Sequence, residues 1–211
     1  MLTAQQLATM LSLQDKMNAK VNPDWLNAGY GYLRAAMVES VEAIEHHGWK
    51  WWKAQQKDLP QLQMELVDIW HFALSELLRK EDVDASIAEA INGVTPLSAT
   101  TPEAQAEQFR LSIEALAASC LRTRSFELQP FLDAMAALPM AFEELFALYI
   151  GKNMLNRFRQ NNGYKTGEYR KLWSGREDNE HLIELLEELN VPAAELPEAL
   201  YDALVVRYSA S

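Results

Sequence analysis

The sequence has few of the residues that cross-link a chain or interrupt its helices. Cys120 is the only cysteine, so one chain can form no internal disulfide, as is typical of proteins in a reducing cytosol. The 8 glycines and 8 prolines fall between periodic segments, and no apolar run is long enough for a transmembrane helix. The first residues have neither a basic start nor a continuous apolar stretch, so we expect no signal peptide.

Basic residues are also scarce. The chain has 19 lysines and arginines against 30 acidic residues, giving a net charge of -11. This balance disfavours a nucleic-acid polymer or a membrane surface as a partner, because phosphate backbones require a basic surface. A small anionic ligand is compatible with it, since divalent cations and a few lysines can hold a phosphate on an acidic protein. A glycine-rich Walker loop is absent, so we do not expect a P-loop ATPase.

Alternation of polar and apolar residues, the pattern of a sheet strand, is missing as well. We therefore predict a single all-α domain over residues 1–211, built as a helical bundle, with a hinge or insertion near 93–101. Asn22 and Pro23 resemble the cap and first residue of a second helix, and Thr101 resembles the cap of another. The predicted helices cover 3–19, 23–47, 58–80, 82–92, 102–122, 126–138, 140–161, 177–189 and 195–206.

Two glutamates lie three residues apart on the second predicted helix. Glu39 and Glu42 fall roughly opposite an apolar stripe at helical spacing. Chance alone supplies several such acidic pairs in a chain of this composition, so the pair is either a solvated face or one wall of a cation site. The stripe consists of Leu33, Met37, Val41 and Ile44.

The third predicted helix carries a second acidic pair, Glu65 and Asp68, in a much less polar setting. The helix is apolar on nearly every side, which is typical of a buried helix, and residues 58–78 contain no basic side chain. Buried carboxylates are costly unless they are paired or coordinate a metal. Cations must therefore come from elsewhere, and Mg²⁺, which prefers oxygen ligands, is the natural candidate.

Residues 151–179 concentrate the basic side chains of this acidic protein. Lys152, Asn156 and Arg159 share one helical face, and Tyr164 and Lys165 follow in the glycine-flanked turn GYKTG. Complementing a helix dipole would account for one or two of these cations. Together with the acidic helices, the region indicates metal-assisted attack on a phosphoanhydride.

The spacing of the four carboxylates resembles the E-x-x-E and E-x-x-D signature of the all-α nucleotide pyrophosphohydrolases. More narrowly, residues 10–180 resemble the dimeric-type dUTP diphosphatases. The motifs that carry this resemblance stand in the same order here: LQDKMN, WKWWK, ELVDIWHF and KNMLNRFRQNNGYKTGEY.

The resemblance implies hydrolysis of dUTP, and of dUDP, to dUMP. It implies that Glu39, Glu42, Glu65 and Asp68 bind Mg²⁺, with Mn²⁺ as a substitute, and that Glu39 orients or deprotonates the attacking water. It also implies a homodimer in which the partner chain helps to complete the site, and the single cysteine favours the cytoplasm as the compartment.

For the substrate, the resemblance implies that Gln14 and Asn18 read the uracil edge, since an amide offers both a donor and an acceptor. Trp49, with Phe72 or His71, would enclose the base or sugar. The residues expected to hold the phosphates and the sugar are Lys152, Asn156, Arg159, Tyr164, Lys165, Lys171 and Asn179.

Other interpretations stay open at this point. The substrate could be another deoxynucleotide such as dCTP, or the chain could be a non-catalytic helical dimer that binds nucleotides or a protein. His71 could bond Asp68 or lie in the core, and Asn179 could instead cap a helix. His46 and His47 lack a second histidine or cysteine cluster, so a zinc site is not expected.

Overall fold

The computed structural model describes residues 4–81, 85–98, 101–192 and 195–211. Among these residues the regular secondary structure is almost entirely helical, which confirms the predicted all-α class. The elements are α1 (Ala4–Val21), α2 (Tyr32–His47), α3 (Leu59–Lys80), α4 (Ala85–Asn92), α5 (Pro102–Arg122), α6 (Leu128–Ala137), α7 (Phe142–Asn161), β1 (Leu172–Trp173), β2 (Arg176–Glu177), α8 (Asp178–Glu188) and α9 (Leu196–Ser209).

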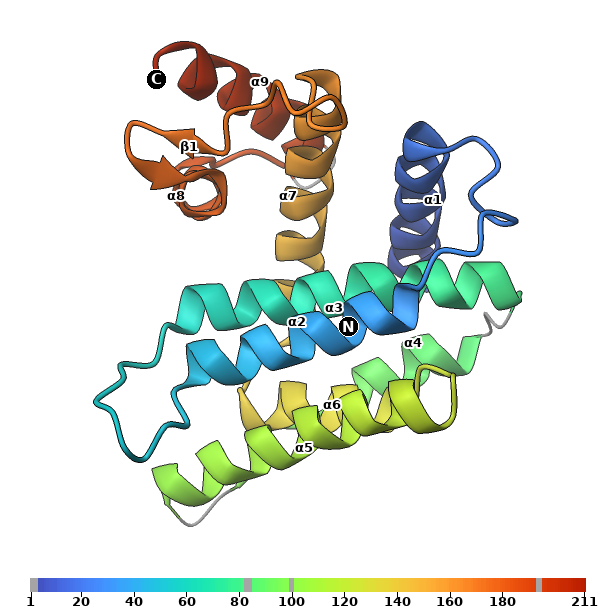
Figure 1. Cartoon of the computed structure of the whole chain (residues 1–211), viewed down its shortest axis with the longest axis vertical. Coiled ribbons are helices and arrows are strands. Elements are labelled where there is room, and N and C mark those ends of the chain that lie inside the picture. The colour runs from blue at the N-terminus through green and yellow to red at the C-terminus, as the bar shows by residue number, and fades with distance from the viewer. Residues whose placement is uncertain (1–3, 82–84, 99–100, 193–194) are drawn as a thin grey trace.

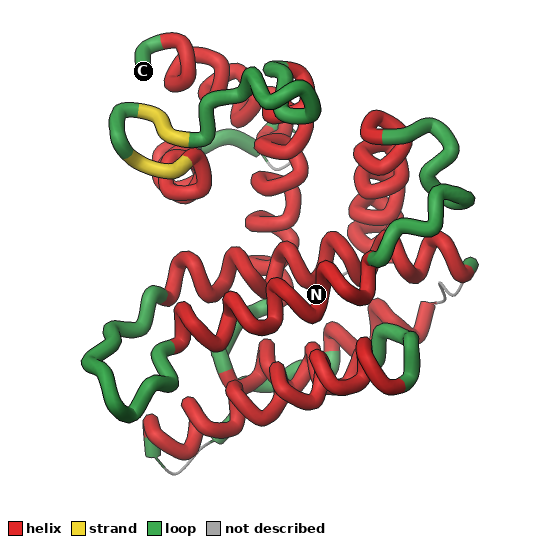
Figure 2. Tube along the Cα trace, in the orientation of Figure 1, coloured by secondary structure: helices red, strands yellow, loops and turns green. Residues whose placement is uncertain are grey.

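The helices form two parts that meet at α3. Figure 1 shows α2 and α3 side by side and antiparallel, with α5 and α6 packed against them. Helices α1 and α7 cross this layer and pack together, and α8 and α9 pack on α7 (Figure 2). Helix α3 contacts α1, α2 and α7, so its side chains can take part in a site on either side of it.

Helix α3 is buried on nearly every side, as its composition predicts. Its start is fixed by Asp58, whose side chain accepts a hydrogen bond from the backbone N–H of Gln61 at 3.2 Å. Trp70 is fully buried and stacks on Phe131 of α6 at 5.3 Å between ring centroids. This packing holds the acidic pair of α3 rigidly between the two parts of the fold.

The predicted start of the second helix is wrong. Residues 22–31 form turns, and α2 begins only at Tyr32. The Asn22 side chain accepts from the backbone of Asp24, which closes a local turn instead of capping a helix. Gly29 adopts a positive φ of 67°, which an α-helix cannot contain, so turn chemistry wins over the Pro23 signal.

The predicted apolar stripe of the second helix is wrong at one position. Leu33, Met37 and Ile44 pack against the core as predicted, but Val41 is 51% exposed. The most buried residues of α2 include Ala36, Ser40 and Ala43, whose small side chains let the helix approach α3 closely. Glu39 is half-buried.

A short hairpin interrupts the predicted helical chain after α7. Strands β1 and β2 pair antiparallel, with Trp173 opposite Arg176. Trp173 is fully buried, and its indole N–H donates to the Arg170 carbonyl at 2.8 Å. The hairpin is therefore anchored by one aromatic side chain, a signal too short for periodicity to reveal.

The remaining predicted helices agree with the structure within a few residues. Thr101 caps α5 as expected, with its hydroxyl accepting from the Ala104 N–H at 3.1 Å. The fourth predicted helix includes 82–84 and the predicted hinge includes 99–100, and these positions lie outside the described residues. Across the described chain, none of the helices has the length and apolarity to cross a membrane.

Candidate active site

A polar cleft of about 640 Å³ lies where α2 and α3 face α7 and the start of α8. Carboxylates from α2 and α3 form one wall, and amino, guanidinium and amide groups from α7 and the C-terminal segment form the other. The residues that line it are Glu39, Glu42, His46, Asp58, Gln61, Glu65, Asp68, Lys152, Arg159, Tyr164, Lys171, Glu177 and Asn179.

The acidic wall brings three of the predicted metal ligands together. One carboxylate oxygen from each of Glu39, Glu42 and Glu65 lies within 4.8 Å of the others. Burial, followed by the charge of Asp68, raises the pKa of Glu65 to about 9 and also raises the pKa of Glu39. Three oxygen donors whose mutual repulsion a cation would relieve fit a hard divalent ion.

Asp68, the fourth predicted ligand, already has a cationic partner from another helix. The Lys152 ammonium lies 2.7 Å from its carboxylate and 3.1 Å from the Asn179 side-chain oxygen. Lys152 is only 3% exposed, so its charge is largely withdrawn from water. The ion pair joins the acidic wall to the basic wall across the cleft.

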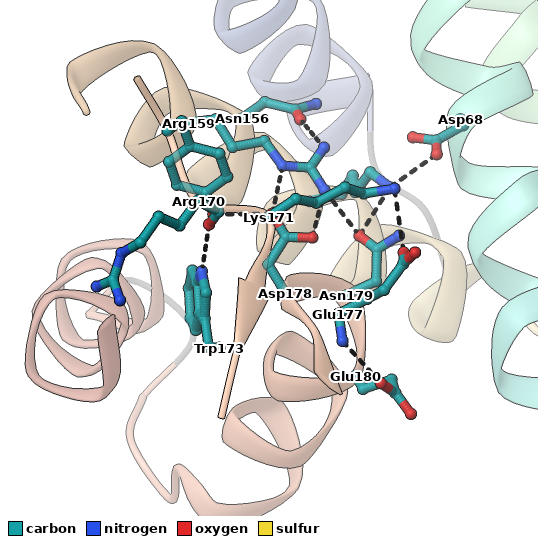
Figure 3. A network of polar contacts seen from close by, with 12 residues as sticks. Asp68, Asn156, Arg159, Arg170, Lys171, Trp173, Glu177, Asp178, Asn179 and Glu180 are labelled. Carbon is teal, nitrogen blue, oxygen red and sulfur yellow. Dashed lines mark hydrogen bonds and ion pairs between the residues drawn. The ribbon is translucent and has the colours of Figure 1, made fainter. Parts of the chain in front are cut away.

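Arg159 lines the cleft and makes several hydrogen bonds within the protein. Its guanidinium makes two hydrogen bonds to the Asp178 carboxylate, at 2.8 and 2.7 Å, and Figure 3 shows the two groups pointing toward each other. It also donates to the side-chain oxygens of Asn156 and Asn179 at 3.1 and 3.3 Å. Arg159 thus orients the polar residues around it.

Asp178 is fully buried at the first position of α8. Burial alone would raise the pKa of this carboxyl, but the hydrogen bonds from Arg159 bring it below its usual value. The suggested cap role for Asn179 is wrong, because Glu177 is the cap and exchanges hydrogen bonds with Glu180. Asn179 is left to accept from Lys152 inside the cleft.

Several predicted substrate residues lie outside this cleft. Gln14 and Asn18 of α1 gather with His71 of α3, whose Nδ1 lies 2.7 Å from the Gln14 side-chain oxygen. His71 is buried and stacks on Tyr149, and within the described residues no hydrogen bond joins it to Asp68. Burial lowers the pKa of His71 to about 4, so its ring is neutral.

Trp49, Phe72 and Lys165 are also not among the residues that line the cleft. The Trp49 indole donates to Glu45 at 2.8 Å, and its ring packs edge-on against Trp52. The Lys165 ammonium donates to the Val21 carbonyl at the end of α1, at 2.9 Å.

The sequence did not single out four of the residues that line the cleft. Asp58 and Gln61 lie at the start of α3, and Glu177 makes an ion pair with Lys171 at 3.0 Å. His46 lies 3.5 Å from the Glu65 carboxylate. The sequence did not distinguish His46 from the neighbouring His47 as a residue of the site, and the only signal for His46 was its position one helical turn after Glu42.

The fold and the cleft define a class of protein. An all-α scaffold with a carboxylate wall opposite a lysine and amide wall is suited to a hydrolase of phosphoanhydrides, which needs cations beside the phosphate chain. Residues 6–164 match the family model described as dUTPase, and the chain belongs to this all-α dUTPase family. It is a dUTP diphosphatase. No curated protein sequence matches the chain.

The match confirms the predicted family and activity, and it covers residues 6–164. Residues 165–211 lie outside the matched range, yet Lys171, Glu177 and Asn179 from this segment line the cleft. One wall of the candidate site is therefore shared between the matched part of the chain and the part that follows it.

Proposed function

We propose that the enzyme hydrolyses both dUTP and dUDP to dUMP with the assistance of Mg²⁺. The observation that carries this proposal is the single cleft in which three clustered carboxylates face Lys152 and Asn179. An acidic wall of this kind accommodates divalent cations, and the opposite wall offers donors to phosphate oxygens.

Glu39, Glu42, Glu65 and Asp68 are the proposed ligands of the ion. All four offer carboxylate oxygens, which favours Mg²⁺, with Mn²⁺ as a substitute. When bound, Mg²⁺ would neutralise phosphate oxygens and make the phosphorus more electrophilic.

Glu39 is the proposed base that orients or deprotonates the attacking water. It lies half-buried in the wall of the cleft beside Glu42 and Glu65, where its carboxylate can accept a proton from a water bound next to the phosphate chain. No covalent enzyme intermediate is needed, because water attacks phosphorus directly.

The phosphate chain is proposed to lie against α7 and the start of α8. Lys152 and Asn179 are the best-placed groups, since both are held in the cleft by hydrogen bonds. Lys171 and Tyr164 are exposed at its edge, where Lys171 pairs with Glu177, while Arg159 and Asn156 act by holding their neighbours in place.

The base and sugar are proposed to lie toward α1, against Gln14, Asn18, His71 and Phe72. His71 and Phe72 come directly after the proposed metal ligands on α3. Gln14 and Asn18 lie on α1, which packs against α3. Trp49 and Lys165 would reach the nucleotide only if the loops that carry them move on binding, since both make other contacts here.

The test of this proposal is a panel of nucleotides with purified enzyme and MgCl₂. We expect pyrophosphate from dUTP and phosphate from dUDP, both with dUMP as product, and no turnover in EDTA. Equal turnover of dCTP would contradict selectivity for uracil, and full activity in EDTA would contradict the metal assignment.

A homodimer is the proposed assembly, and the cytoplasm the proposed compartment, in keeping with a lone, buried Cys120. The outer face of α2 supports the dimer, because Val38 and Val41 are 42% and 51% exposed and lie one turn apart. This helix also carries Glu39 and Glu42, so a partner covering it would lie beside the cleft.

The dimer predicts a native mass of twice 24.0 kDa in light scattering. Val41→Glu is expected to shift the protein to the monomer, because a charge would be buried in the contact. Val206→Glu is the matched control, since Val206 is 69% exposed on α9, away from the carboxylates. A dimer that survives Val41→Glu unchanged would exclude this face as the interface.

A further inference from the structure

A closed set of hydrogen bonds joins α1, α3 and α7 beside the cleft. It consists of Gln14 and Asn18 of α1, His71 and Ser75 of α3, and Tyr149 of α7. Gln14, His71, Ser75 and Tyr149 are buried, and Asn18 is half-buried. The roles of Ser75 and Tyr149 follow from which atom is the donor and which the acceptor in each of these hydrogen bonds.

Ser75 sets the direction of the network. Its hydroxyl donates to the His71 carbonyl one turn earlier, at 3.0 Å, so its oxygen can only accept from other partners. Two amide groups lie within reach of that oxygen, Gln14 at 3.0 Å and Asn18 at 2.9 Å. Both must present nitrogen to it, which fixes the orientation of each amide.

Gln14 is left with no hydrogen-bonding capacity for a ligand. Its second amide proton goes to the Asn18 side-chain oxygen at 3.0 Å. Its own oxygen accepts from the Tyr149 hydroxyl at 3.0 Å and from His71 Nδ1 at 2.7 Å. With two protons donated and two lone pairs occupied, the amide is saturated.

Tyr149 and His71 hold the other side of the Gln14 amide. The Tyr149 hydroxyl is also 2.9 Å from the Met10 carbonyl, so its proton lies between two acceptors and its oxygen is anchored to α1. Because Gln14 presents oxygen to His71, the proton of the neutral ring must lie on Nδ1. His71 Nε2 is then an acceptor, and it is buried with no partner among the described residues.

Asn18 differs from Gln14 in keeping one donor and one acceptor. Within the described residues its side chain makes only the bonds to Gln14 and Ser75, so one amide proton and one lone pair remain available. If the amide flipped, its oxygen would face the Ser75 oxygen at 2.9 Å with no proton between them. The flipped state would therefore lose a hydrogen bond and gain repulsion.

We propose that Ser75 and Tyr149 are positioning residues that lock the Asn18 amide in one orientation, and that this lock lets the enzyme reject cytosine. The inference rests on the proposed placement of the base beside α1. Uracil has a proton at N3, whereas cytosine has a lone pair there. An amide that faces N3 must therefore present oxygen to uracil and nitrogen to cytosine, and it can bind both bases only if it flips. In this arrangement Asn18 reads the base, and Gln14 holds Asn18 in place.

The lock predicts a change in selectivity when one hydroxyl is removed. Ser75→Ala takes away the oxygen that accepts from both amides, so that Asn18 is oriented by its hydrogen bond from Gln14 alone. The ratio of kcat/KM for dUTP to that for dCTP is expected to fall about tenfold, the effect of losing one oriented hydrogen bond. A role confined to stability would lower both values together and leave the ratio unchanged.

The controls separate the lock from folding and from the activity itself. Ser119→Ala removes a buried hydroxyl on α5, which donates to the Leu116 carbonyl, and should not change the ratio. Tyr149→Phe tests the same network without removing a carbon atom if Ser75→Ala does not fold. An unchanged ratio in a folded Ser75→Ala or Tyr149→Phe enzyme overturns the lock alone. A wild-type enzyme that does not hydrolyse dUTP overturns the function and the lock together.

Discussion

Replacing Glu65 with glutamine is expected to lower kcat for dUTP by about a thousandfold or more. The Glu65 carboxylate lies at the centre of the acidic wall, within 4.8 Å of Glu39 and Glu42, and glutamine removes its charge while keeping its shape. Loss of one electrostatic group at a reacting phosphate has effects of this order. The measurement is steady-state release of pyrophosphate in MgCl₂.

Glu45→Gln is the matched control on α2. Glu45 hydrogen bonds to Lys50 and Trp49 instead of facing the cleft, and the Lys50 hydrogen bond lowers its pKa. We expect this variant to retain activity close to that of the wild type. Full activity in Glu65→Gln, or an equal loss in Glu45→Gln, would contradict the proposed ligand set.

Glu65→Gln should also change how the free energy of unfolding depends on pH in protein treated with EDTA. The pKa of Glu65 is about 9 in the folded chain and near 4.5 when unfolded. Between these values the folded state keeps a proton that the unfolded state has released, so the free energy of unfolding falls as pH rises. The slope is at most about 1.4 kcal/mol per pH unit. Urea titrations from pH 5 to 9 should show this fall in the wild type, its reversal by MgCl₂, and a flatter profile in Glu65→Gln.

Asp178→Asn is expected to be the most destabilising single substitution at the basic wall of the cleft. The substitution leaves the Arg159 charge buried without its counterion, because Asp178 is fully buried and binds Arg159 through both oxygens. Breaking a buried pair from one side costs about 3–5 kcal/mol. Urea unfolding measures the loss, and the KM for dUTP should rise because Asn179 loses its fixed position.

Glu184→Gln provides a matched comparison in the same segment. Glu184 also pairs with two arginines, Arg176 and Arg207, but it is exposed, and exposed pairs contribute little. If Asp178→Asn cost no more than this control, the Arg159 pair would not be the structural anchor of the wall.

The sequence was most informative where one local signal had no competitor. The prediction placed helix α3 within a residue of its observed bounds, and its apolar residues on nearly every side correctly indicated a buried helix. The same composition indicated that Glu65 and Asp68 needed cations from elsewhere. Lys152 supplies one of them from α7, which a pattern within α3 could not specify.

Competing signals account for the errors in α2. Pro23 favours a helix start, but Gly29 and Gly31 follow it, and the glycines prevail because they permit turns. The buried face of α2 was predicted only in part, because the prediction relied on large apolar residues and included the exposed Val41. Close approach to α3 also buries Ala36 and Ala43, which only the partner helix makes apparent.

The roles of single polar residues depended most on tertiary contacts. Ser75 and Tyr149 carry no recognisable motif, and their importance arises from hydrogen bonds that join three helices. Asn179 looked like a cap, yet Glu177 takes that role two residues earlier. The role of each of these residues depends on its distance from residues of other helices, and the spacing of residues along the sequence does not reveal those distances.

The matched family segment ends at Tyr164, while the wall opposite the carboxylates continues to Asn179. Under the proposed assignment, the four ligands of the ion belong to the matched stretch, and part of the wall that faces them belongs to the stretch that follows. A substitution confined to residues 165–211 therefore changes only the wall proposed to hold the phosphate chain and leaves the four proposed ligands of the ion in place.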